Sequence, residues 1–133
     1  MNGPAQPYRR CVLHVCTSCR APGSPREPFE SRPGYQLYRE LRSSIGESAL
    51  ADYVEVRSAE CLSLCPRPCG IALSSAGAWS YLFGDQSLPS AREVEACVEL
   101  YARTTDGFMP RDQRPKSLRA SVLGRVPPLP GGR

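Results

Sequence analysis

The sequence predicts an α/β fold with a small mixed sheet of about four strands and two helices. Two observations predict this class. Residues 9–15 form a short apolar, β-branched run and residues 53–59 alternate apolar and polar residues, both typical of strands, and a helical repeat lies between them. Residues 71–84 contain two further short runs of this kind, and a second helical repeat follows them.

The first half of the chain is expected to form a strand, a helix and a second strand. RRCVLHV at 9–15 predicts a buried strand, and the Pro- and Gly-rich segment 21–34 predicts a loop. YVEVRSA at 53–59 alternates apolar and polar residues, which predicts the second strand. Between them, Pro33 stands near a helix start and Gly46 near its end. The apolar residues at helical spacing are Leu37, Tyr38, Leu41 and Ile45.

The second half is expected to form a hairpin and a helix. IALSSAGAWSYLFG at 71–84 predicts two strands joined around residues 75–77. Ser90 and Glu93 fit the S-x-x-E capping pattern, and the helix behind them is expected to end near Gly107. Its apolar stripe consists of Val94, Cys97, Val98 and Tyr101.

We expect one domain over residues 1–108 and a basic, Pro-containing tail over 109–133. The tail carries five Arg and one Lys against the single Asp112, whereas the preceding part is nearly neutral. The tail also carries apolar residues, so we expect a segment that covers the body or docks a partner, with a helical turn across Leu118 and Val122.

Composition excludes several classes of function. The net charge of +4 belongs to the tail, and the aromatic residues are not interleaved with charges, so we expect no nucleic-acid binding. The chain shows neither a secretory signal nor a membrane anchor, so we expect a cytoplasmic protein with reduced thiols. Seven cysteines are an odd count, which suits metal ligation better than a disulfide framework.

Two cysteine clusters each follow a predicted strand. Cys16 and Cys19 are spaced C-x2-C after the first strand, and Cys61, Cys65 and Cys69 are spaced C-x3-C-x3-C after the second. If these strands are parallel neighbours, both clusters emerge at the same edge of the sheet. Four thiolates converging there would form a metal or iron-sulfur site.

The residues alone leave three kinds of site open. Four cysteines suit structural zinc, and thiolates on loops rich in backbone N–H groups suit an iron-sulfur cluster. A thiol redox site using Cys65 and Cys69 is the third. A c-type haem is excluded because Arg20, not His, follows the C-x2-C pair.

The remaining candidates have simpler interpretations. We expect Cys11 and Cys97 to be buried core thiols, and His14 to be a strand residue that packs its ring. Arg20 and Arg67 flank the two cysteine pairs and would offset the negative charge of a thiolate-bound cluster. No motif for independent catalysis is present, so we expect no enzyme.

The element order and the motifs HVCTSCR and CLSLC resemble those of the thioredoxin-like 2Fe-2S ferredoxins. More narrowly, HVCTSCR, CLSLCPRPCGIAL, MPRDQRP and RVPP look like an uncharacterised bacterial family described as predicted metal-binding proteins, a resemblance that spans about residues 14–128. The broader resemblance implies a thioredoxin-like fold, a 2Fe-2S cluster, one-electron transfer to a redox partner protein, and a homodimer.

The same resemblance implies a ligand set. It consists of Cys16, Cys19, Cys61 and Cys65, with Cys69 as a substitute or neighbour. The sequence departs from many of these ferredoxins in two respects: only Thr17 and Ser18 separate the first pair, and Cys69 is an additional thiol.

Overall fold

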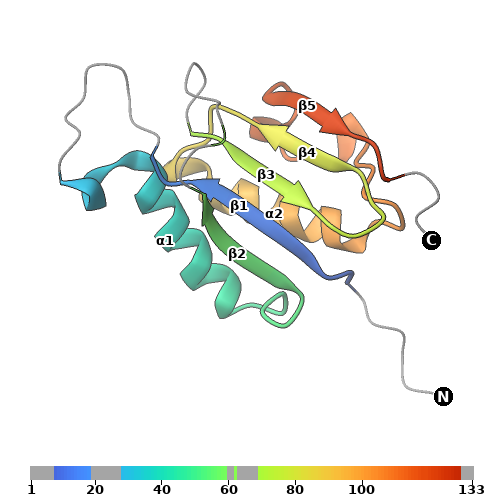
Figure 1. Ribbon diagram of the computed structural model, residues 1–133, viewed down its shortest axis with the longest axis horizontal. Helices are drawn as coiled ribbons and strands as arrows, with labels where there is room; N and C mark the ends of the chain where they lie inside the picture. Colours follow the sequence, from blue (N-terminus) through green and yellow to red (C-terminus); the bar gives the residue numbers. More distant parts are fainter. Residues whose placement is uncertain (1–7, 19–27, 60–61, 63–68, 130–133) are drawn as a thin grey trace.

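The computed structural model of the protein describes residues 8–18, 28–59, 62 and 69–129. These residues form a five-stranded sheet with two α-helices (Figure 1). The helices are α1 (Pro33–Gly46) and α2 (Ala91–Arg103). The strands are β1 (Cys11–Cys16), β2 (Val54–Ala59), β3 (Ile71–Ser74), β4 (Ser80–Phe83) and β5 (Val122–Val126). The α/β class predicted from the sequence is confirmed.

The sheet has the strand order β2-β1-β3-β4-β5. β1 and β2 are parallel, and α1 lies in the connection between them. Every other neighbouring pair is antiparallel. The hairpin predicted over residues 71–84 is therefore present as β3 and β4, and the sheet is mixed as expected.

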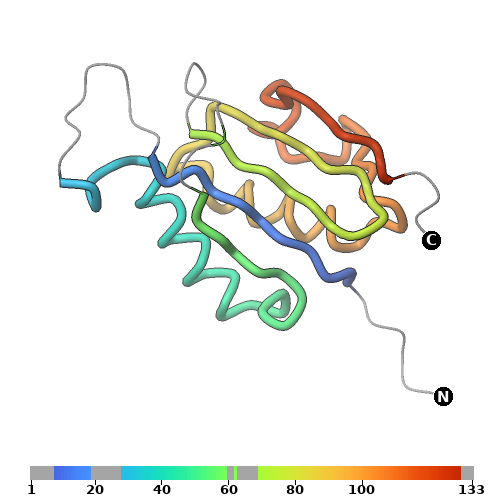
Figure 2. The backbone as a smooth tube through the Cα atoms, viewed as in Figure 1, coloured from blue at the N-terminus to red at the C-terminus, as the bar shows by residue number. Residues whose placement is uncertain are grey.

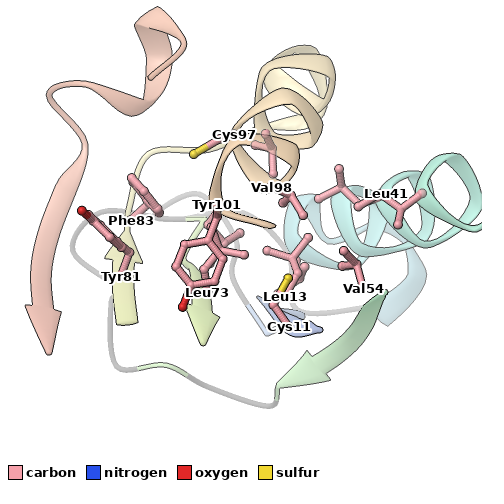
Figure 3. Close-up of a cluster of buried hydrophobic side chains, with 14 of the residues drawn as sticks. Cys11, Leu13, Leu41, Val54, Leu73, Tyr81, Phe83, Cys97, Val98 and Tyr101 are labelled. Atoms are coloured by element: carbon pink, nitrogen blue, oxygen red, sulfur yellow. The ribbon is translucent and has the colours of Figure 1, made fainter. Parts of the chain in front are cut away.

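One hydrophobic core lies between the sheet and the two helices (Figure 3). On β1, Cys11, Leu13 and Val15 are buried, whereas the intervening Val12 and His14 are only half-buried. This alternation follows from the period of two of a strand, because successive side chains point to opposite faces. The helices contribute Leu37, Leu41 and Ile45 from α1 and Val94, Cys97, Val98 and Tyr101 from α2.

The sheet has one strand more than predicted, and this strand comes from the tail. β5 pairs antiparallel with β4, so that Val122 lies opposite Phe83 and Val126 opposite Ser80. Figure 2 shows this red segment of the chain running alongside the yellow β4. The expectation that the tail lies against the body is confirmed for its described residues.

The helical turn expected across Leu118 and Val122 is wrong. Leu118 ends a 3₁₀ turn at Lys116–Leu118, and Val122 begins β5. Leu118 and Met109 are nevertheless both buried in the core cluster. Tertiary packing and pairing with β4 therefore determine the backbone here, not the spacing of two apolar residues.

Ser90 is the N-cap residue of α2 as expected, but the side-chain hydrogen bonds expected of a capping pair with Glu93 are absent. The Ser90 hydroxyl accepts a hydrogen bond from the Ser87 N–H at 3.0 Å, within the 3₁₀ turn Leu88–Ser90 that precedes α2. The Glu93 carboxylate instead accepts the N–H of Ser117 at 2.8 Å. Glu93 therefore attaches the C-terminal segment to α2.

No helix in the described ranges combines the length and the apolar character needed to cross a bilayer.

Candidate cofactor edge

Three segments of the chain meet where β1 ends. Because β1 and β2 are parallel, Cys16 at the end of β1 lies opposite Ala59 at the end of β2. The N–H of Cys16 donates to the carbonyl oxygen of Gly70, directly before β3, at 3.0 Å. We call this place the β1/β2 edge; Figure 1 shows both arrowheads pointing toward it.

Cys16 is shielded from solvent at this edge. It follows Val12 and His14 on the same face of β1, yet its exposed fraction is only 1%, whereas those two residues are half-buried. A thiolate in such a place gains little stabilisation from water and depends on a cation or on hydrogen-bond donors. Cys16 thus has the surroundings of a ligand residue or of a neutral core thiol.

Thr17 extends the contact between the two strand ends. Its N–H donates to the carbonyl oxygen of Ala59 at 2.9 Å, and its hydroxyl donates to the same oxygen at 3.2 Å. Thr17 is itself buried. The two chain segments that carry the cysteine motifs are therefore held together as they leave the sheet, and Cys61 is only two positions after Ala59 in the sequence.

Cys69 is the second described thiol at this edge. It is 3% exposed and precedes Gly70, the partner of Cys16. Its backbone forms a reciprocal pair with Gln86: the N–H of each residue donates to the carbonyl oxygen of the other, at 3.0 and 3.1 Å. The backbone at Cys69 is fixed by this pair.

Gln86 is a structural residue that the sequence analysis missed. Its buried side-chain amide donates to the carbonyl oxygen of Gly84 at 2.8 Å and to the hydroxyl of Ser121 at 3.1 Å. Gln86 thereby connects the Cys69 backbone to the segment before β5. A single Gln in a turn carries no pattern that would have predicted this role.

The predicted ligands fall mostly outside the described residues. The residues outside the described ranges include the predicted ligands Cys19, Cys61 and Cys65 and the flanking Arg20 and Arg67. Within the described ranges, no group of three or more His, Cys, Asp or Glu residues is arranged to hold a metal ion. The donor chemistry of the edge nevertheless fits iron or zinc, since its two described donor residues, Cys16 and Cys69, are thiols. A four-thiolate site would take its further ligands from the adjoining segments.

The expectation that Cys11 and Cys97 belong to the core is confirmed. Burial raises the pKa of the Cys11 thiol to about 11 and that of the Cys97 thiol to about 12. The Cys97 sulfur lies 3.7 Å from the sulfur of Met109. Figure 3 shows both cysteines among the apolar side chains. Neither thiol has the lowered pKa of a reactive cysteine.

His14 lies on the sheet face opposite the core. Its Nε2 is 3.3 Å from the Ser74 hydroxyl, and the ring is half-buried. Burial, and then the charge of Arg57, lower the pKa of His14, so the ring is neutral at pH 7. His14 packs on the strand surface, as expected from the sequence.

Comparison with known proteins gives a family and a fold. The sequence model of a family described as "Protein of unknown function (DUF1636)" matches residues 13–128. No curated protein matches the sequence significantly. The structure is similar to that of a thioredoxin-like [2Fe-2S] ferredoxin from Aquifex aeolicus, with a TM-score of 0.60 and 15% sequence identity. That match covers 90% of this chain and 96% of the ferredoxin. The thioredoxin-like fold is therefore confirmed, whereas a family described as metal-binding is not.

Proposed function

The chain belongs to the DUF1636 family, and from its thioredoxin-like fold and its two cysteine motifs we propose that it is a one-electron carrier holding a 2Fe-2S cluster. The carrying observation is the meeting of β1, β2 and β3 at the β1/β2 edge, with Cys16 opposite Ala59 and hydrogen-bonded to Gly70. Both cysteine motifs adjoin this edge in the sequence. The similar ferredoxin, which is named for a 2Fe-2S cluster, supports the proposal through its fold.

The proposed ligands are the thiolates of Cys16, Cys19, Cys61 and Cys65, with Cys69 as a neighbour or substitute. Bound there, the cluster would supply reversible one-electron oxidation and reduction. The chain itself would shield the site from solvent at Cys16. It would also hold the backbone in place on both sides of the site. Thr17 fixes one side through Ala59, and Cys69 fixes the other through Gln86.

The proposed partner is a redox protein. The proposed location is the cytoplasm, where reducing conditions keep the ligand thiols from forming disulfides. Arg20 and Arg67 flank the cysteine motifs and would offer positive charge to an acidic partner surface. The proposed activity is electron transfer through the bound cluster, without an enzymatic reaction of its own.

The test is the metal content of protein purified without oxygen. We expect visible absorption, with about two iron and two sulfide per chain, and an electron-paramagnetic signal on one-electron reduction. A colourless protein holding about one zinc per chain would instead establish a zinc-binding module. A metal-free protein with titratable thiols would establish thiol redox chemistry at Cys65 and Cys69.

Single alanine substitutions then test the ligand set. Cys16→Ala, Cys61→Ala and Cys65→Ala should each abolish or destabilise the cluster, because iron loses a thiolate ligand. Cys97→Ala is the control, since it removes a thiol that is as buried as Cys16 but lies within α2. A normal visible spectrum in Cys61→Ala would contradict the assignment.

A further inference from the structure

A second candidate site lies apart from the β1/β2 edge, between β4, β5 and the segment that follows α2. It is a pocket of about 270 Å³. Three arginines contribute to its lining: Arg111, Arg114 and Arg125. The rest of the lining is apolar or aromatic, including Tyr81, Phe108 and Met109, and no described acidic residue lines it.

Arg114 is the central observation. It is only 7% exposed, and its Nε is buried without a hydrogen-bond partner in the described part of the chain. Its guanidinium carbon lies 5.9 Å from the centre of the Tyr81 ring. A cation–π contact offsets only part of the cost of removing a charged, donor-rich group from water. The Nε of Arg114 therefore lacks an acceptor.

The neighbouring arginine is held by aromatic rings. The guanidinium carbon of Arg125 lies 4.9 Å from the centre of the Trp79 ring and 5.4 Å from that of Phe108. Such stacking leaves the edge of a guanidinium group, which carries its N–H donors, free to face a ligand. Arg125 is thus oriented without using a carboxylate.

Some arginines of the described surface are neutralised by ion pairs, whereas those of the pocket are not. Arg57, Arg92 and Arg103 each form an ion pair with a nearby glutamate. None of the three pocket arginines forms an ion pair within the described ranges. The pocket therefore concentrates positive charge that the described part of the fold does not neutralise.

We propose that this pocket binds a small oxyanion, the phosphate or carboxylate group of a small molecule. Guanidinium groups form bidentate hydrogen bonds with both kinds of anion, and the rings of Tyr81 and Phe108 contact two of these groups. The volume is slightly below the range of about 300–1,000 Å³ for drug-sized ligands, so it suits a compact anion. This site is independent of the proposed cluster, which adjoins the β1/β2 edge.

The fluorescence of Trp79, the single tryptophan, provides the test. Inorganic phosphate and succinate are titrated separately at constant ionic strength, with chloride as the balancing anion. We expect a saturable fluorescence change with at least one of them, and the stronger response identifies the anion class. A response equal to that of chloride for both would overturn the proposal.

Variants assign the binding to the pocket. Arg114→Gln should weaken binding of the responding anion at least tenfold, whereas Arg57→Gln, on the distant edge strand β2, should leave it unchanged. The anion should also raise the melting temperature of the wild type but not that of Arg114→Gln. A structural role for Arg114 predicts instead the same rise in both proteins.

A second variant covers the case in which Arg114→Gln does not fold. Arg111 is exposed and belongs to the 3₁₀ turn Arg111–Gln113, so Arg111→Gln should fold normally. It should weaken anion binding several-fold. Undiminished binding in this variant, or in a folded Arg114→Gln, would overturn the proposal.

Discussion

At the scale of single residues, the described cysteines fall into two chemical groups. Cys11 and Cys97 belong to the apolar core, and burial raises the pKa of both thiols. Cys16 and Cys69 are equally shielded but lie at the β1/β2 edge, where the backbone is hydrogen-bonded across three segments. Position at the sheet edge, and not the degree of burial, therefore separates candidate ligands from core thiols.

The raised pKa of Cys97 predicts a dependence of stability on pH. Its pKa is about 12 in the folded protein against an ordinary value of 9.0, so ionisation is favoured on unfolding. Its contribution to stability is complete below pH 9 and is lost as the pH rises toward 12. We expect the free energy of unfolding, measured in urea, to fall between pH 8 and pH 10.5 less steeply in Cys97→Ala than in the wild type. Equal slopes would show that Cys97 ionises as easily in the folded state.

At the scale of elements, the C-terminal segment is part of the fold. Leu118 is fully buried, whereas Leu129, beyond β5, is 83% exposed. Leu118→Ala should lower the free energy of unfolding by about 2–5 kcal/mol, because it removes apolar burial and leaves a cavity. Leu129→Ala is the matched control and should change it by less than about 0.5 kcal/mol. Similar values for the two variants in urea unfolding would contradict this description of the segment.

The turn after α2 depends on Gly107. Its φ of +85° is unfavourable for other residues, and a Cβ there would lie 2.8 Å from the Trp79 backbone nitrogen. Gly107→Ala should therefore lower the melting temperature, with a cost of at least about 1–3 kcal/mol. At Gly46, the last residue of α1, a Cβ would meet no atom within 4 Å, so Gly46→Ala should be neutral or slightly stabilising. A melting temperature unchanged by Gly107→Ala would contradict this account.

The sequence predicted those helices and strands that are specified by residues close together in the chain. α1 and the hairpin of β3 and β4 were found because apolar periodicity and turn residues specify them within a few positions. β5 was missed because VLGRV contains a glycine and an arginine and becomes a strand only by pairing with β4. Glu93 was misassigned for a similar reason, since its partner Ser117 is 24 positions away.

Of the arrangement around the candidate site, the sequence predicted the parallel pairing of β1 and β2, which the structure shows. The order strand, helix, strand implies a parallel pair, and this pair places Cys16 opposite Ala59. The roles of Gln86 and Arg114 depend on contacts with distant segments, which no local pattern encodes. Ligation by Cys19, Cys61 and Cys65 stays a prediction.

At the scale of the whole molecule, the described sheet has one face covered by helices and one without them. The homodimer implied by the resemblance to thioredoxin-like ferredoxins stays a prediction. Ile71 and Leu73 point into the core, whereas Ala72 and Leu82 lie on the opposite face and are half-buried. A dimer would therefore use this second face.

Light scattering at high micromolar concentration tests the assembly. We expect a mass about twice the 14.6 kDa of the chain. Ala72→Glu should give a monomer, because a charge would be desolvated at the interface. Ser43→Glu on the exposed side of α1 is the control and should leave the dimer intact. A monomeric wild type would contradict the expectation.

The reciprocal hydrogen bonds between Cys69 and Gln86 also have a consequence for local opening of the structure, which amide hydrogen exchange measures. A buried, bonded amide exchanges its proton for deuterium only when the surrounding structure separates. Because the Gln86 side chain also bonds to Ser121, separating Cys69 from Gln86 disturbs the approach to β5 as well. The amide protons of Cys69 and Gln86 should thus exchange at the same rate. This rate measures how often the β1/β2 edge and the C-terminal segment open together as one cooperative unit.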